Sequence, residues 1–144
     1  MKQDFGTYIE LCGAIHLHTT YSDGGIEFPE LVAAAADVGL DFIVITDHMT
    51  LAGKEAGYGG RSAELLVVIG YEHEDSRKQN HYLVLGTDRV VNERDRPQRY
   101  IDAVRKMGGT GFIAHPMENR NYFKQLPPYP WTDWEVTGYD GIEI

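Results

Sequence analysis

The sequence predicts an α/β domain with a parallel sheet. Apolar, β-branched runs of strand length alternate with two helical segments, which is the pattern of parallel α/β proteins. The chain has 144 residues, the length of one domain with a sizeable core. Its composition, 42% hydrophobic and 24% charged, is typical of a globular domain. We therefore expect residues 1–144 to form a single domain.

The strands are predicted from continuous apolar stretches bounded by glycine, proline or polar residues. A run such as FIVIT is apolar on successive residues, which suits a strand buried on both faces of a sheet. Six such stretches occur, at residues 11–17, 42–46, 65–72, 81–86, 111–116 and 139–144.

Two helices are expected between these strands. The first begins at Phe28, with Pro29 in the first turn, where a missing N–H costs little, and Gly39 ends it. The second spans residues 96–107, because its apolar side chains fall on one helical face before Gly108. A short helical turn is also expected near residues 62–65.

Most of the predicted strands end in a side chain of a type that can bind a metal ion or a proton. In parallel α/β sheets, active sites are built at the carboxyl edge of the strands. His81 differs, because it opens its strand rather than closing it. His73 is left out, because a lone histidine near a strand is more often structural. The strand-end residues are His16 and His18, then Asp47 and His48, then Glu72, and finally His115.

His16 and His18 are predicted to share a direction, because residues i and i+2 of a strand face the same side. Carboxylates and imidazoles gathered at one edge would need cations to offset the cost of desolvating the acids. Imidazole and carboxylate without thiolate suit Zn, Mn, Fe or Co. The candidates exceed the needs of one tetrahedral ion, so a site with two or three metals is expected. Such a site can clamp a phosphate and make hydroxide from water.

The composition limits the partners and the location that we expect for the protein. The net charge of −9 argues against broad nucleic-acid binding, which needs clustered Lys and Arg, and disfavours a long nucleic acid as substrate. No apolar run approaches the roughly 18 residues that span a bilayer, so no membrane partner is expected. No signal peptide is predicted at the N-terminus. Cys12 is the only cysteine, and a cytoplasmic location is expected.

Four blocks of the chain, taken in order, resemble the PHP (polymerase and histidinol phosphatase) family. They are HLHTTYSDG, ITDH, GYE followed by NHYLVLG, and AHP, and the final DGIEI resembles the family's sixth strand. The resemblance implies a distorted (βα)7 TIM-like barrel with a multinuclear metal site. It also implies phosphoesterase chemistry, in which a metal-activated water attacks a small phosphorylated substrate. The metals implied are Zn, Mn or Fe.

Carried over by position, the resemblance implies a role for each candidate. His16 and His18 would bind one metal, and Asp23 and His48 a second. Glu72 would bridge two metals, and His81 and His115 would complete a third position. The catalytic role falls to Asp47, His48 and Glu72, with Asp47 orienting a ligand or hydrogen-bonding a neighbour rather than binding metal.

One block of the family is missing. The family places an Asp-x-His pair after its last strand, and no Asp-x-His occurs in this chain. The expected barrel is therefore truncated before its seventh strand, and the domain is C-terminally incomplete. Three explanations stay open: a truncated product, a homo-oligomer whose copies share strands to complete the barrel, or a divergent protein without activity. The alternative function is a non-catalytic metal-binding module with a structural or regulatory role.

Phosphate binding normally recruits basic side chains as well as metals. Arg61, after the glycine-rich run, and Arg120, after the AHP block, are candidates, although both are equally plausible as solvated loop residues. A further alternative is an amidohydrolase, which also opens with an HxH strand. The SDG after HxH and the TDH of the second strand favour the PHP family.

Overall fold

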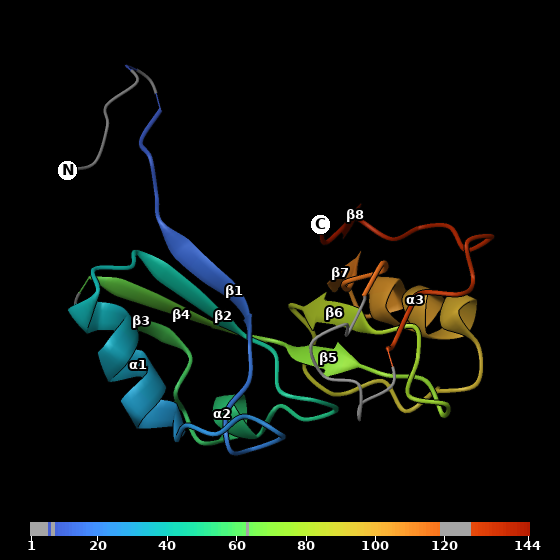
Figure 1. Ribbon diagram of the computed structural model, residues 1–144, viewed down its shortest axis with the longest axis horizontal. Coiled ribbons are helices and arrows are strands. Elements are labelled where there is room, and N and C mark those ends of the chain that lie inside the picture. The colour runs from blue at the N-terminus through green and yellow to red at the C-terminus, as the bar shows by residue number, and fades with distance from the viewer. Residues whose placement is uncertain (1–5, 7, 63, 119–127) are drawn as a thin grey trace. The chain divides into compact units, whose positions relative to one another are not determined.

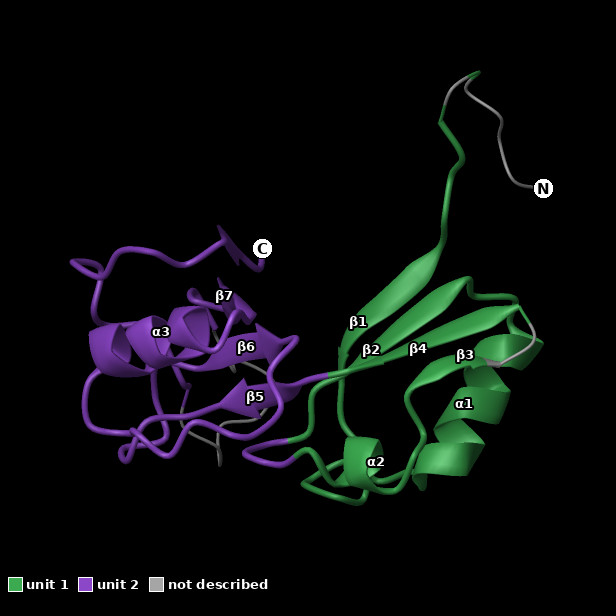
Figure 2. Cartoon of the chain, turned by 180° about the vertical axis from the view of Figure 1, so that it is seen from behind, with its two compact units in different colours: residues 1–47, 51–69 green, residues 48–50, 70–144 purple. Residues whose placement is uncertain are grey.

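The chain forms two compact units. A computed structural model describes residue 6 and residues 8–62, 64–118 and 128–144. Unit 1 comprises residues 1–47 and 51–69, and unit 2 comprises residues 48–50 and 70–144 (Figure 2).

Unit 1 contains a four-stranded sheet with the order β1-β2-β4-β3 (Figure 1). Strands β1, β2 and β4 are parallel, and β3 pairs with β4 in the antiparallel sense. The strands are β1 (Gly13–Leu17), β2 (Phe42–Ile45), β3 (Gly60–Ser62) and β4 (Leu65–Ile69), and the helices are α1 (Phe28–Asp37) and α2 (Ala52–Glu55).

Helix α1 covers one face of this sheet. Pro29 stands in its first turn, and Gly39 follows it with a φ of 78°, so both predicted boundary signals are confirmed. The helix is amphipathic and packs its apolar face on the strands. The buried core consists of Phe28, Ala35, Ile43, Ile45, Leu65 and Val67.

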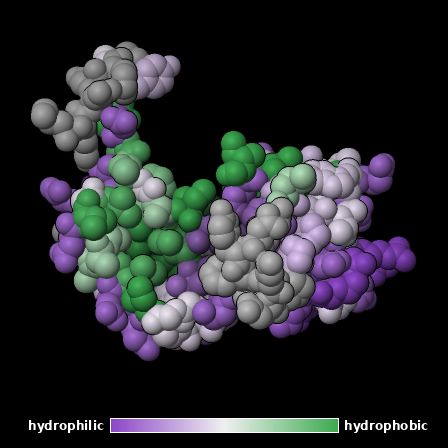
Figure 3. All heavy atoms as spheres, viewed as in Figure 1, coloured by the Kyte–Doolittle hydropathy of each residue, from purple (hydrophilic) through white to green (hydrophobic). Residues whose placement is uncertain are grey.

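The opposite face of the same sheet stays partly open. Ala14 pairs with Ile43 of the core, so Ile15 points to the other side, where Leu66 also lies. Ile15 is 57% exposed and Leu66 is 38% exposed. Figure 3 shows hydrophobic residues gathered on the visible surface of this unit.

Unit 2 contains a second four-stranded sheet, with the order β5-β6-β7-β8. The pairs β5–β6 and β6–β7 are antiparallel, and β7–β8 is parallel. Helix α3 buries Tyr100, Ile101 and Val104. The elements are β5 (Tyr71–His73), β6 (Tyr82–Leu85), α3 (Pro97–Lys106), β7 (Thr110–Ile113) and β8 (Gly141–Ile142).

The mixed α/β class is confirmed, but the strand arrangement differs from the prediction. The run 65–72, expected as one strand, divides at Gly70 into β4 and β5, which belong to different sheets. A side chain at Gly70 would place its Cβ 2.2 Å from the carbonyl oxygen of Val84, so glycine permits this close approach. The described strands form two open sheets with three antiparallel pairs and no closed barrel, so the truncated (βα)7 barrel is not confirmed.

The helical turn expected near residues 62–65 is also wrong. Residues 60–62 instead form β3, which turns back onto β4 and pairs Arg61 with Leu66. A single turn of helix occurs earlier, in α2. The tertiary pairing with β4 overrides the weak local preference of this short segment.

Helices α1 and α3 have ten residues each, against the roughly 20 that cross a bilayer. Within the described ranges, no helix has the length and apolar character of a membrane span.

Candidate metal centre

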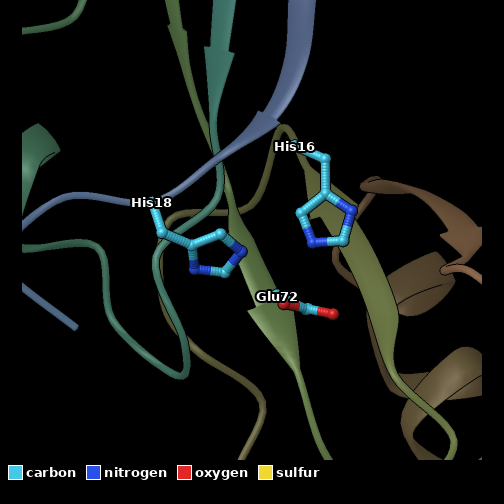
Figure 4. Close-up of side chains that lie close together, drawn as sticks. All are labelled: His16, His18 and Glu72. Atoms are coloured by element: carbon cyan, nitrogen blue, oxygen red, sulfur yellow. The ribbon is translucent and has the colours of Figure 1, made fainter. Parts of the chain in front are cut away.

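Three histidines of unit 2 surround one carboxylate, that of Glu72 on β5 (labelled in Figure 4). Its Oε1 lies 2.7 Å from His81 Nδ1 and 2.9 Å from His115 Nε2. Its Oε2 lies 3.4 Å from His48 Nδ1. All four belong to the same unit, and all four were predicted from the sequence as metal ligands.

The strand directions explain this convergence. Glu72 is central in β5, and His115 follows the end of β7. Strand β6 is antiparallel to both, so its beginning lies beside their ends, and the backbone carbonyl of His81 accepts from Ala114 N at 3.0 Å. His81 therefore opens its strand and still reaches the same place, which resolves its exceptional position in the sequence.

His48 joins the group through a short backbone bridge. It forms an isolated parallel bridge with Glu72, and the N–H of Met49 donates to the carbonyl oxygen of Glu72 at 3.0 Å. Met49 has a φ of 52°, the left-handed region that non-glycine residues rarely adopt. The segment after β2 is thus held against β5 by its backbone, which places the imidazole of His48 beside the carboxylate.

Glu72 and His81 of this group are buried, whereas His48 and His115 are partly exposed. Glu72 is 1% exposed and His81 is 3% exposed. Tyr129 stacks on the ring of His81, with ring centroids 5.2 Å apart and planes 18° apart. Within the described part of the chain, His81 Nε2 is buried without a hydrogen-bond partner.

These features fit a metal ion. A buried carboxylate is costly unless positive charge lies nearby, and a metal ion held by the carboxylate and by imidazole nitrogens would supply that charge. Ligand atoms of His48, Glu72 and His81 lie within 4.8 Å of one another. The donor set of imidazole nitrogens and carboxylate oxygens suits a first-row divalent ion such as Zn, Mn or Fe.

Unit 1 holds a second group at the end of β1. Figure 4 shows the imidazoles of His16 and His18 on the same side of this segment, and their ring centroids lie 5.1 Å apart. The predicted reason, strand alternation, is wrong. The pairing register shifts between Ala14 and Leu17, and His16 has a φ of 62°. The two rings therefore lie close together at an irregularity of the strand rather than along a regular one.

His18 is supported by the loop that follows it. Its Nδ1 lies 3.4 Å from Ser22 Oγ and 3.3 Å from Asp23 Oδ1. Asp23 is the predicted carboxylate ligand of this segment, and its side chain is 69% exposed. Partners at Nδ1 fix the orientation of the His18 ring.

Asp47 is buried beneath this loop and holds it in place. Its carboxylate accepts from Thr19 N at 2.7 Å, from Thr19 Oγ1 at 2.8 Å and from Ser22 Oγ at 2.7 Å. The resemblance implied that Asp47 orients a ligand or hydrogen-bonds a neighbour, and the three hydrogen bonds join it to Thr19 and Ser22, neither of which is a predicted ligand. The supporting roles of Thr19 and Ser22 were not predicted, although both lie within the HTTYSDG block.

The two candidate phosphate-binding arginines gain no support. Arg61 lies on β3, an edge strand of its sheet, whereas His16 and His18 lie at the other edge strand, β1. Arg120 lies outside the described residues. Both assignments stay predictions.

His73 is not part of the metal-ligand group. It alternates with Glu72 along β5, so the two side chains face opposite sides of the sheet. Its ring is fully buried and lies 4.2 Å from the ring of Tyr100 on α3. Burial is the largest cause that lowers the pKa of His73 to about 4. His73 is therefore neutral in the folded core.

This burial predicts acid sensitivity. The unfolded chain binds a proton at His73 below the ordinary pKa of about 6.5, whereas the folded chain binds it only near pH 4, so stability is lost as pH falls between these values. We expect a loss approaching about 3 kcal/mol for this one group. Urea unfolding of the chelator-treated protein from pH 7 to pH 4.5 measures it. His73→Phe should show a flatter pH dependence, and parallel curves for the two proteins would contradict the prediction.

Comparisons with known proteins identify a family and similar folds. The family model described as "PHP domain" matches residues 14–114. A Bifidobacterium adolescentis protein, provisionally assigned as a metal-dependent phosphoesterase, superimposes with a TM-score of 0.64 at 17% identity, over 92% of this chain and 77% of its own.

A second solved structure also has a fold similar to that of this chain. It is a two-domain protein of Bacteroides vulgatus that contains a predicted PHP-like metal-dependent phosphoesterase, with a TM-score of 0.55 and 21% identity. The match covers 86% of this chain but only 39% of that protein. No curated protein sequence matches the chain significantly. The family match over residues 14–114, well over half of the sequence, shows that the chain belongs to the PHP domain family.

Proposed function

We propose that the chain hydrolyses a small phosphate ester with the help of two or three divalent metal ions. The observation that carries the proposal is the buried Glu72 carboxylate with His48, His81 and His115 within 3.4 Å of its oxygens. Membership of the PHP family supports the same reaction class, as do the assignments of the two solved neighbours.

Divalent ions held by such ligands supply a nucleophile from water at neutral pH and offset the charge of a phosphate group. The residues of this chain bind the ions and orient the side chains that hold them. Glu72 fixes the rings of His81 and His115 through short contacts with their nitrogens. Asp47 holds the loop that supports His18. We propose His16, His18 and Asp23 as further ligands, as the PHP resemblance implies.

Metal analysis and hydrolysis of an aryl phosphate test the proposal together. The purified chain should contain Mn, Zn or Fe, lose hydrolysis after chelation, and recover it when one of these ions is returned. The double variant His16→Ala, His18→Ala should lose hydrolysis and at least one of the bound ions. His73→Phe is the matched control, because it removes a histidine of the opposite sheet face and should retain metal.

The outcomes separate the two candidate functions. Less than about one ion per chain in the wild-type protein would overturn the proposal, since a site of this kind holds its metal tightly at neutral pH. Metal binding without turnover would favour the non-catalytic module that the missing Asp-x-His pair suggests.

A further inference from the structure

The last strand, β8, is bounded by two acidic residues that each make a pair of hydrogen bonds beside β7. Asp140 donates its N–H to Gly111 O at 2.8 Å and accepts from Gly111 N through Oδ2 at 2.8 Å. Glu143 donates its N–H to Ile113 O at 2.9 Å and accepts from His115 N through Oε2 at 2.8 Å. The two residues are thus equivalent anchors at the two ends of one short parallel pairing.

His115, the partner of Glu143, has an unfavourable backbone. Its φ is 25°, in the left-handed region, and the next residue is Pro116, which restricts the residue before it. Such a conformation persists only where the surroundings hold it. Here the N–H is held by Glu143, and the carbonyl oxygen accepts from Glu118 N at 3.0 Å. His115 is therefore fixed on both sides of its Cα.

The backbone of His115 decides where its ring lies. The φ angle sets the direction of the Cα–Cβ bond, so a relaxation to the common negative-φ regions would swing the imidazole away from its present place. In that place, Nε2 lies 2.9 Å from Glu72 Oε1. The hydrogen bond from His115 N to a carboxylate is of the charge-assisted kind, which is shorter and stronger than a neutral one.

We propose that Glu143 is a positioning residue of the metal centre. Its carboxylate holds His115 in the left-handed conformation and thereby presents the imidazole to Glu72 and to a metal ion. The inference rests on the proposed function in one respect, that His115 is a metal ligand. The positioning of the ring itself is a property of the metal-free chain and can be measured there.

Asp140 supplies the matched control. Asp140→Ala and Glu143→Ala each remove one carboxylate and one hydrogen bond from the same strand pairing. Glu143→Ala should weaken Mn²⁺ or Zn²⁺ affinity by about 10- to 100-fold, whereas Asp140→Ala should change it by less than about twofold. Glu143→Gln keeps an acceptor oxygen and should recover most of the affinity. Equal losses in the two alanine variants, or none in Glu143→Ala, would overturn the inference.

The metal-free protein gives an independent measurement. In Glu143→Ala, the amide of His115 should exchange with solvent at least about tenfold faster, and its ring nitrogen resonances should move toward those of a solvated imidazole. In Asp140→Ala, both should stay near the wild-type values. Unchanged exchange and ring shifts in Glu143→Ala would refute the positioning role. If the wild-type chain binds no metal, the proposed function fails, and these metal-free measurements alone decide the inference.

Discussion

Glu72→Gln is expected to abolish tight metal binding and hydrolysis. The carboxylate contacts His81 and His115 through Oε1 and His48 through Oε2, so one side chain contacts all three imidazoles. Glutamine has nearly the same shape but no charge to offset that of an ion. Because even partners of metal ligands contribute about 10- to 100-fold to affinity, loss of the ligand itself should weaken binding by at least about 100-fold.

Metal titration of the stripped protein and aryl phosphate hydrolysis measure this effect. Glu74→Gln is a matched control, because Glu74 lies two residues along the chain and pairs with Arg94 at 2.6 Å. That variant should bind metal like the wild-type protein, since an ion pair near the surface contributes little. Metal affinity in Glu72→Gln within a few-fold of wild type would show that Glu72 is not a ligand.

Asp47→Ala is expected to produce the second large effect, on stability and on His18 together. Three hydrogen bonds end on this carboxylate, from the N–H and the hydroxyl of Thr19 and from the hydroxyl of Ser22. Thr19 is fully buried, so its donors would be left without water. Orphaned buried donors cost about 1–3 kcal/mol each, and we expect a total loss of about 3 kcal/mol in the free energy of unfolding.

Urea unfolding and metal titration check both parts of the prediction. Metal affinity should fall by about 10- to 100-fold, because the loop that holds Ser22 beside His18 loses its anchor. Asp41→Ala is the control, because Asp41 accepts from Cys12 N in an exposed place near the start of β2. It should cost no more than about 1 kcal/mol and leave metal affinity unchanged. Equal effects of the two variants would argue against a specific role for Asp47.

The candidate ligands of unit 2 were found from local sequence signals. An apolar run that ends in His marks both the strand and its functional end, and this holds for His115 after β7; Glu72 was found in the same way, although it lies in the middle of β5 rather than at the end of one long strand. His48 follows β2 in the same way. These signals are local because the apolar residues of a buried strand are consecutive in the sequence. The helix boundaries at Pro29 and Gly39 were predicted correctly because Pro and Gly are likewise local signals.

The arrangement of the strands was not predicted, because it depends on pairing between distant residues. No sequence signal near His81 indicates that β6 is antiparallel to its neighbours. Only its pairing with the strands of Glu72 and Ile113 shows this direction. The break at Gly70 depends in the same way on the carbonyl oxygen of Val84. Parallel and antiparallel strands share one apolar pattern when both are buried, so the pattern alone could not choose.

The sequence by itself determined the residue types of the centre, its lack of thiolate, and the family blocks that carry it. Only the tertiary structure decided how those residues are held. His16 lies beside His18 at a register shift of the strand, and a carboxylate 28 residues away holds the backbone of His115. Both His16 and His115 have left-handed backbones, and a non-glycine residue carries no local signal for this conformation. The candidate ligands can therefore be predicted from the sequence, whereas their orientation arises from contacts that exist only after folding.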